Sequence, residues 1–278
     1  GFAHHMELPL AASWHTNVHE YLARRSGWLL RLLPEQQSAA TGQKIQDMTL
    51  AVAGKFYSMA RVLFAPNPEL CALLEKVTGR KCHLMPRGVD AELFHPAKRK
   101  RNPEELGQVL GFVGRLSVEK NVALLAQVQQ ELERMGRTDF RFLIVGHGKD
   151  ETWLRERLPR AEFTGVLRGE PLAEAYAKMD LFVFPSHTDT FGNVVLEALA
   201  SGVPAIVTPD GGPATIVRDG ETGRIVCDEE FAAAAAGVLA DAEKHTQMRI
   251  AARKYALTAS WDSVFEGVYA AYETMLLK

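Results

Sequence analysis

The sequence of 278 residues has little of three things that mark specialised protein classes: cysteine, charge of one sign, and long apolar runs. Its cysteines, Cys71, Cys82 and Cys227, are odd in number and lack the spacing of a metal site or a redox motif, so we expect reduced thiols in a cytoplasmic protein. The formal net charge of −2 argues against a protein that coats nucleic acid. No apolar run approaches the roughly 20 residues that a membrane-spanning helix needs.

The first residues also lack an initiator methionine and the pattern of a signal peptide. A strand-like run at residues 10–14 follows almost at once, so we expect the chain to begin within a domain. What is present is typical of a globular protein: 47% hydrophobic and 24% charged residues, in a length that suffices for one large or two medium domains.

Short β-branched or aromatic runs alternate along the chain with longer helical patterns. We expect strands at 10–14, 61–65, 83–85, 109–113, 141–145, 161–163, 181–184, 204–207 and 224–226. We expect helices at 18–33, 43–59, 68–78, 122–135, 151–158, 171–179, 193–200, 229–242, 247–257 and 261–278. This alternation predicts an α/β fold with parallel sheets covered on both faces, which bind ligands at the carboxyl ends of their strands.

A basic run at residues 98–101, followed by Pro103, predicts a solvated linker between two units. Binding of nucleic acid or lipid headgroups is the weaker interpretation of this run, and we expect no nucleic-acid partner. The predicted division is an incomplete N-terminal unit at 1–100, a fuller unit at 101–260, and a C-terminal helix at 261–278 that folds back on the first unit.

Two strand-to-helix turns carry groups suited to a phosphate ligand. Gly114 ends one strand, and Arg115 and Lys120 flank the turn that follows, where fixed cations beside free amides suit a diphosphate. Two solvated surface cations are the alternative. In the second turn, Gly146 and Gly148 let the backbone approach a ligand, although a tight turn explains them equally well.

Two carboxylates bracket the start of a short apolar helix. Gly192, Asn193 and Val194 present its first free amides, as an anion site would. Glu197 lies about one turn inside this helix, where a carboxylate needs partners because its desolvation costs several kcal/mol. The two hydroxyls of a ribose would supply them. Asp189, on the preceding loop, is free to reach another polyol, and a favourable position near a helix N-terminus is its alternative role.

These motifs occur in an order that resembles glycosyltransferase family 4. The resemblance is carried by Gly114-Arg115 with Glu119-Lys120, Gly146 with Gly148, Asp189–Glu197, Ala200–Pro204 and Gly211–Pro213. The segment from Pro86 to Pro96 resembles the connector between the two domains of that family, and the helix after Trp261 resembles its closing helix. The family implies a GT-B fold, with two Rossmann-like domains, and a retaining transferase that uses a nucleotide sugar.

The resemblance also implies roles for individual residues. Arg115 and Lys120 would hold the donor diphosphate, Glu197 the ribose hydroxyls, and Asp189 the hydroxyls of the donor sugar. His15 matches a histidine that faces the donor sugar from the N-terminal domain, and it joins Asp189, Arg115 and Lys120 in the expected catalytic set; a strand-end histidine satisfied by backbone is the alternative. The remaining donor-binding positions would be Gly114, Gly146, Val166, Leu167, Phe191, Gly192, Asn193 and Val194.

Three departures from the family pattern stand out. The first acid of its acidic pair is Asp189 where glutamate is usual, and Arg87 stands where asparagine is common. The first strands of the family and its first glycine-rich loop have no counterpart here. We therefore expect an incomplete N-terminal domain, and a chain that lacks part of the active site.

The predicted function is that of a retaining glycosyltransferase that moves a hexose from a UDP- or GDP-linked sugar to a hydroxyl of a glycan, a glycolipid or a small molecule. Retention by front-face attack, as the resemblance implies, does not need the acid–base pair of a glycosidase. Stabilisation of the leaving diphosphate by side-chain cations and helix amides would then be the main catalytic contribution. We expect no metal and no cofactor besides the nucleotide sugar.

Two other functions remain open. A non-catalytic module that binds nucleotide sugars would follow from the incomplete N-terminal domain, whereas no residue specifically favours a sugar-nucleotide epimerase. The segment 20–33 mixes arginine with tryptophan and leucine, so it either packs within the N-terminal domain or lies on an anionic membrane surface, which would imply a lipid-linked acceptor. We expect the protein in the cytoplasm, free or on the inner face of a membrane.

Overall fold

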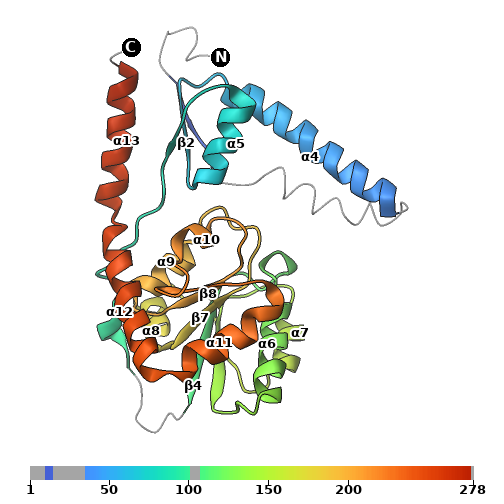
Figure 1. The fold of residues 1–278 in the computed structure, drawn as a ribbon, viewed down its shortest axis with the longest axis vertical. Coiled ribbons are helices and arrows are strands. Elements are labelled where there is room, and N and C mark those ends of the chain that lie inside the picture. The colour runs from blue at the N-terminus through green and yellow to red at the C-terminus, as the bar shows by residue number, and fades with distance from the viewer. Residues whose placement is uncertain (1–9, 15–34, 101–106, 277–278) are drawn as a thin grey trace. The chain divides into compact units, whose positions relative to one another are not determined.

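The computed structural model describes residues 10–14, 35–100 and 107–276, which form two compact units (Figure 1). The first unit comprises residues 1–86 and 264–278, and the second comprises residues 87–263. The division therefore lies at Pro86–Arg87, upstream of the basic run at which the sequence analysis placed it. Val89 and Phe94 are buried in the hydrophobic core of the second unit, which explains why the connector belongs to that unit.

The first unit is built on a parallel sheet with the strand order β1-β2-β3. Its elements are β1 (Ala11–Ser13), β2 (Val62–Ala65), β3 (Cys82–Leu84), α4 (Glu35–Tyr57), α5 (Pro68–Thr78) and most of α13 (Trp261–Leu276). Val268 and Ala271 of α13 share a buried cluster with Val62 and Phe64 of β2. The last helix of the chain thus completes the core of the first unit.

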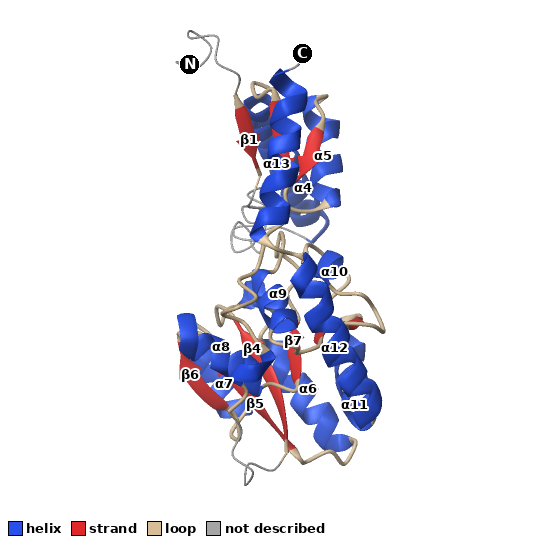
Figure 2. Cartoon of the chain, turned by 90° about the vertical axis from the view of Figure 1, so that its left-hand side faces the viewer, coloured by secondary structure: helices blue, strands red, loops and turns tan. Residues whose placement is uncertain are grey.

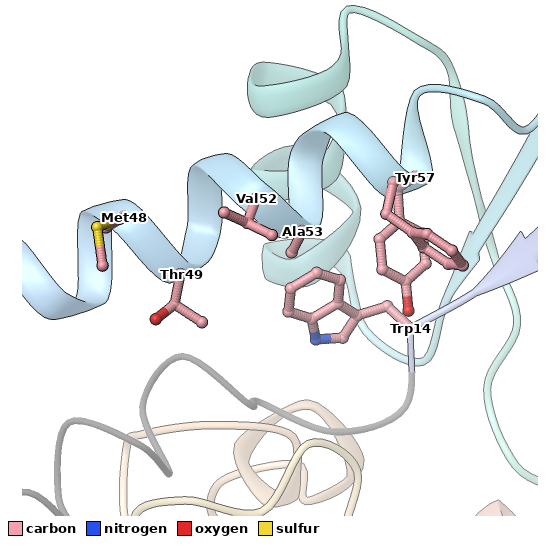
Figure 3. A pocket seen from close by; sticks show the side chains of 7 residues that line it. Trp14, Met48, Thr49, Val52, Ala53 and Tyr57 are labelled. Carbon is pink, nitrogen blue, oxygen red and sulfur yellow. The ribbon is translucent and has the colours of Figure 1, made fainter.

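The first unit also holds an apolar pocket of about 490 Å³ against one side of α4 (Figure 3). Its lining residues are Trp14, Met48, Thr49, Val52, Ala53, Phe56 and Tyr57. Trp14 is only 3% exposed, and its ring lies 5.0 Å from that of Tyr57. Because none of the lining residues is charged, we do not assign phosphate or acid–base chemistry to this pocket.

The second unit is built on a six-stranded parallel sheet with the order β6-β5-β4-β7-β8-β9. The strands are β4 (Gln108–Val113), β5 (Phe140–Val145), β6 (Glu162–Gly165), β7 (Leu181–Phe184), β8 (Ala205–Val207) and β9 (Gly223–Ile225). The chain runs outward from β4 to β6, returns to the centre, and runs outward again from β7. This is the doubly wound Rossmann order, in which the direction of winding reverses between β4 and β7.

Helices lie on both sides of this sheet (Figure 2). The helical segments of the second unit are η1 (Pro96–Lys98), η2 (Val118–Lys120), α6 (Ala123–Arg134), α7 (Glu151–Arg157), α8 (Gly169–Lys178), α9 (Asn193–Ala200), α10 (Pro213–Ile216), η3 (Asp228–Glu230), α11 (Phe231–Ala240) and α12 (Ala242–Thr258). The prediction of an α/β fold with parallel sheets is confirmed. The short α10 and the three 3-10 helices were not predicted, and the expected helix at 18–33 lies outside the described residues.

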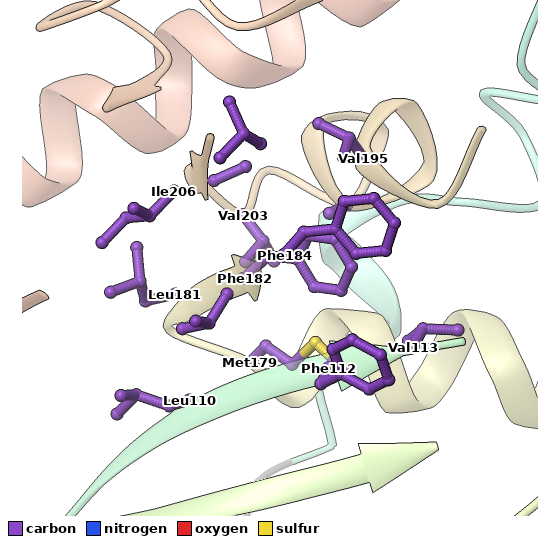
Figure 4. Packing of buried hydrophobic residues seen from close by; sticks show 14 of the residues in the cluster. Leu110, Phe112, Val113, Met179, Leu181, Phe182, Phe184, Val195, Val203 and Ile206 are labelled. Carbon is purple, nitrogen blue, oxygen red and sulfur yellow. The ribbon is translucent and has the colours of Figure 1, made fainter. Parts of the chain in front are cut away.

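The two central strands of the second unit are joined by a stack of buried aromatic rings (Figure 4). The rings of Phe112 and Phe184 lie 6.1 Å apart, and those of Phe182 and Phe184 lie 5.8 Å apart. All three side chains are at most 1% exposed, so each contributes roughly 1.5–3 kcal/mol of burial to stability. This core fixes the strand ends from which the loops of the candidate site leave the sheet.

The described part of the basic run, residues 98–100, is not the solvated linker that we expected. Arg99 donates to Asp180 at 2.6 Å, and Asp180 also accepts from the amide of Val109 at 2.9 Å. Lys98 and Lys100 pair with Glu170 and Glu174 of α8. The sequence could not show this because the acidic partners lie more than 70 positions along the chain.

No helix among the described residues is both long enough and apolar enough to pass through a lipid bilayer. The segment 20–33, for which a membrane-surface role was considered, lies outside those residues.

Candidate functional site

The candidate site lies where the winding of the second sheet reverses, at the carboxyl ends of β4 and β7. β4 ends at Val113 and leads through Gly114 into the turn that carries Lys120, while β7 ends at Phe184 and leads into the loop that carries Asp189. Neighbouring strands whose connections leave in opposite directions leave a crevice between those connections, which is where open α/β sheets bind their ligands.

Lys120 and Asp189 meet where these two connections leave the sheet. The Lys120 ammonium lies 2.6 Å from each carboxylate oxygen of Asp189, although the two residues are 69 positions apart. The same ammonium lies 5.7 Å from the centre of the Phe184 ring. The side chains are only 24% and 21% exposed, so water screens this ion pair less than it screens an exposed one. A cation and a carboxylate that the sequence analysis assigned to one ligand are therefore neighbours.

The loop that carries Asp189 packs against the turn formed by Gly211 and Gly212. The amide of Gly212 donates to the Asp189 carbonyl at 2.7 Å. A β-carbon at Gly212 would lie 2.3 Å from the Thr190 carbonyl oxygen and from the α-carbon of Phe191. Only glycine fits between these backbones, so the Gly211-Gly212 turn fixes the position of the Asp189 backbone relative to the sheet.

Helix α9 begins with free amides at the end of this loop. Gly192 is its N-cap, with φ of 89°, a backbone conformation that favours glycine. No side chain caps the helix, and Asn193 is exposed. The first amides of the helix therefore remain available to water or to an anionic ligand.

Glu197 is held by a partner that the sequence analysis missed. The Tyr176 hydroxyl donates to its Oε2 at 2.9 Å, and Tyr176 itself is fully buried. Burial raises the pKa of Glu197, and the weaker, opposite effect of the Tyr176 hydrogen bond does not reverse this. The other carboxylate oxygen has no hydrogen-bond partner among the described residues. Glu197 thus presents one fixed and one unused oxygen on an apolar helix, as a site for hydroxyl ligands would.

The glycines after β5 bring two loops into contact. A β-carbon at Gly146 would lie 1.9 Å from the Gly114 carbonyl oxygen, and one at Gly148 would lie 1.9 Å from that of Leu116. The close approach is therefore to the backbone of the neighbouring turn. Arg115 lies on that turn, is exposed, and forms no ion pair within the described part of the chain. Its guanidinium remains available to an anion.

Gly146→Ala is expected to lower the free energy of unfolding by about 2–4 kcal/mol, because a methyl group there meets backbone that cannot move aside and the residue has φ of 137°. Gly237→Ala, in the exposed part of α11 with no atom within 4 Å of the new methyl group, should instead stabilise by about 0.5–1 kcal/mol. Urea denaturation of both variants checks this pair. Equal effects would show that the turns at 114 and 146 do not pack as described.

A second cluster, which the sequence analysis did not identify, borders the Asp189 loop. The Nδ1 atom of His187 lies 2.7 Å from Asp210, and its Nε2 atom lies 3.1 Å from Asp228. Asp228 also accepts from the Asn121 amide at 2.9 Å. These residues come from four different loops, so no sequence motif could reveal the cluster.

The other predicted positions are more dispersed. Val166 is 62% exposed and Leu167 is half-buried, both just after β6, while Phe191 is 9% exposed under the loop of Asp189. His15 lies outside the described residues, so its predicted role stays a prediction.

Within the described ranges, no group of three or more histidine, cysteine, aspartate or glutamate side chains is arranged to hold a metal ion.

Sequence comparison relates the chain to known transferases. Residues 107–241 match the family described as Glycosyl transferases group 1. The chain is 39% identical over 201 residues to a GDP-mannose-dependent alpha-mannosyltransferase of Corynebacterium glutamicum, covering 69% of this chain and 45% of that protein. It is also 39% identical over 226 residues to the enzyme of that name in Mycolicibacterium smegmatis, covering 79% of this chain and 59% of that protein. The chain thus spans about half the length of these relatives.

Comparison of structures supports the same fold. The sucrose-phosphate synthase of Thermosynechococcus elongatus superposes with a TM-score of 0.77 at 21% identity, over 97% of this chain and 68% of that one. The Anabaena protein HepE, solved with UDP and glucose, superposes with a TM-score of 0.69 at 17% identity, over 98% and 73%. At such identities the likeness establishes the fold, which is of the GT-B type.

Proposed function

We propose that the chain, whose residues 107–241 match the family described as Glycosyl transferases group 1, forms the donor-binding part of a retaining glycosyltransferase. The donor is a nucleoside diphosphate sugar, and the product is a glycoside of an acceptor hydroxyl on a glycan, a lipid or a small molecule. The observation that carries this proposal is the meeting of Lys120 and Asp189 at the switch point of the sheet, on the loop that leads into the helix of Glu197.

The described contacts suit the three parts of such a donor. The diphosphate lies against Lys120, Arg115 and the free amides at the start of α9, because these are the cationic and hydrogen-bond-donating groups of the crevice. The ribose diol donates to Glu197, whose unused oxygen is otherwise left without a partner. The transferred sugar places its hydroxyls on Asp189.

The same contacts to the diphosphate, the ribose and the transferred sugar suit group transfer. Bond cleavage at the anomeric carbon leaves negative charge on the diphosphate, and fixed cations and helix amides stabilise that charge more than they stabilise the bound donor. In front-face attack the departing phosphate takes the acceptor proton, so no side chain has to serve as a general base. His15 is proposed to hydrogen-bond the donor sugar.

We propose GDP-mannose as the donor. Support comes from two relatives named as GDP-mannose-dependent mannosyltransferases, each 39% identical to this chain. The base is proposed to lie against the backbone at Val166 and Leu167, which follows β6 at the open edge of the sheet. Contacts to backbone rather than to side chains would explain why the sequence alone did not reveal the base.

The test is a thermal-shift and calorimetry panel of GDP, UDP, ADP, GDP-mannose and UDP-glucose on this chain. A ligand present at 100 times its dissociation constant adds about 2.7 kcal/mol of stability. We expect the guanosine ligands to give the largest shift. A larger shift with UDP-glucose would keep the donor site but overturn the choice of base, and no shift with any nucleotide would overturn the donor site itself. Binding without transfer to any acceptor would favour the non-catalytic module.

A further inference from the structure

The contacts of His187 connect the loop of Asp189, the proposed sugar carboxylate, to the loops that carry Asp210, Asp228 and, through Asp228, Asn121. Its ring joins Asp210, which directly precedes the glycine turn beneath Asp189, to Asp228 at the start of η3. The second oxygen of Asp228 is bonded to Asn121, the residue after Lys120. The histidine is itself two residues before Asp189 on the same loop.

These contacts form two closed circuits through Asp189. One runs from His187 through Asp228 and Asn121 to Lys120, whose ammonium returns to the Asp189 carboxylate at 2.6 Å. The other runs from His187 through Asp210 to Gly212, whose amide returns to the Asp189 carbonyl at 2.7 Å. Contacts on both sides restrict the positions that the Asp189 loop can take over the sheet.

The two contacts of the His187 ring restrict which side chains could replace it. A carboxylate can only accept hydrogen bonds, and an imidazole nitrogen donates only when it carries a proton. Both contacts are hydrogen bonds together only in the cationic ring, with both nitrogens protonated. The histidine is 29% exposed and its partners are 62% and 35% exposed, so the cluster is partly open to solvent rather than buried.

We propose that His187 is a positioning residue that fixes the Asp189 loop and so determines how strongly the site prefers a sugar nucleotide to the bare nucleoside diphosphate. The inference rests on the proposed function, because Asp189 is taken there to hold the sugar hydroxyls. His187 acts through the loop and does not itself touch the donor.

The test pairs two variants of His187. His187→Gln offers donors on a single nitrogen and an oxygen that repels a carboxylate, whereas His187→Arg offers several donors, enough for both carboxylates. We expect His187→Gln to lower the ratio of GDP-mannose affinity to GDP affinity by about tenfold, within the range of coupling in one hydrogen-bond network. His187→Arg should retain most of the ratio. In an Asp189→Asn background, His187→Gln should change the ratio no further.

A ligand-free measurement keeps this proposal separate from the proposed function. Hydrogen exchange of peptides covering residues 186–192 and 208–213 should quicken in His187→Gln and stay near the parent rate in His187→Arg. Unchanged exchange in His187→Gln, or an equal loss of affinity for GDP and GDP-mannose, would overturn the positioning role. If the parent bound neither nucleotide, the proposed function would fail, while the exchange data would still decide whether His187 fixes the loop.

Discussion

Replacing Lys120 by alanine is expected to weaken the binding of GDP by about 10- to 100-fold. Hydrogen bonds to charged groups contribute about 1.5–3 kcal/mol, and each 1.4 kcal/mol is a factor of ten in affinity. The loss has two sources. The diphosphate loses its ammonium, and Asp189, only 21% exposed, is left as a carboxylate without its cation beside the incoming phosphates.

A second variant separates these two sources. Lys120→Ala with Asp189→Asn removes the ammonium but leaves no unpaired carboxylate, so GDP affinity should recover in part, although the preference for GDP-mannose should be lost. Lys254→Ala, an exposed lysine on α12, makes the same change in net charge and should leave GDP affinity within twofold. Calorimetry measures all three. GDP binding by Lys120→Ala at the parent affinity would remove this lysine from the phosphate site.

Replacing Glu197 by glutamine is expected to weaken GDP binding and yet stabilise the free protein at neutral pH. A neutral amide is a poorer acceptor for the ribose diol, so affinity should fall by about 10- to 100-fold. Stability should rise because burial raises the pKa of Glu197, which means that its ionised form disfavours the folded state.

The pH dependence of this gain has a definite sign. A carboxyl whose pKa is higher in the folded than in the unfolded state favours folding below its ordinary value of 4.5, and that contribution is lost as the pH rises through the folded pKa. The difference in melting temperature between Glu197→Gln and the parent should therefore be small at pH 4 and larger, in favour of the variant, at pH 7.5. Glu156, on α7, supplies the matched control because its side chain is 68% exposed. Glu156→Gln should therefore show neither effect. A variant less stable than its parent at pH 7.5 would contradict the role of burial.

The fold was readable from the sequence because parallel strands covered on both faces are short continuous apolar runs. Residues 181–184 are such a run, fully buried between helices, and the predicted strand matches β7 residue for residue. Helix α5 was equally readable, because Asn67 caps its start, Pro68 occupies its first turn and Gly79 ends it. Signals of this kind depend on neighbours in the chain.

What the sequence could not show depends on neighbours in space. Tyr176 reads as one more apolar position of α8, and only the fold places its hydroxyl on Glu197. The basic residues at 98–100 read as a solvated run because their acidic partners lie on an element far along the chain. His187 carries no motif at all, since its carboxylate partners come from loops after two other strands.

The ion pair of Lys120 with Asp189 bears on which cellular anions compete for the crevice. Inorganic phosphate approaching the ammonium meets the carboxylate at nearly the same distance, so attraction and repulsion largely cancel. To bind the Lys120 ammonium, phosphate would have to displace Asp189 from it and leave that carboxylate without a counter-charge. In the proposed donor site, a sugar nucleotide would bring an anion for Lys120 and hydroxyls for Asp189 in one molecule. On that proposal, the ion pair would make the site select against the small phosphates that are abundant in any cell.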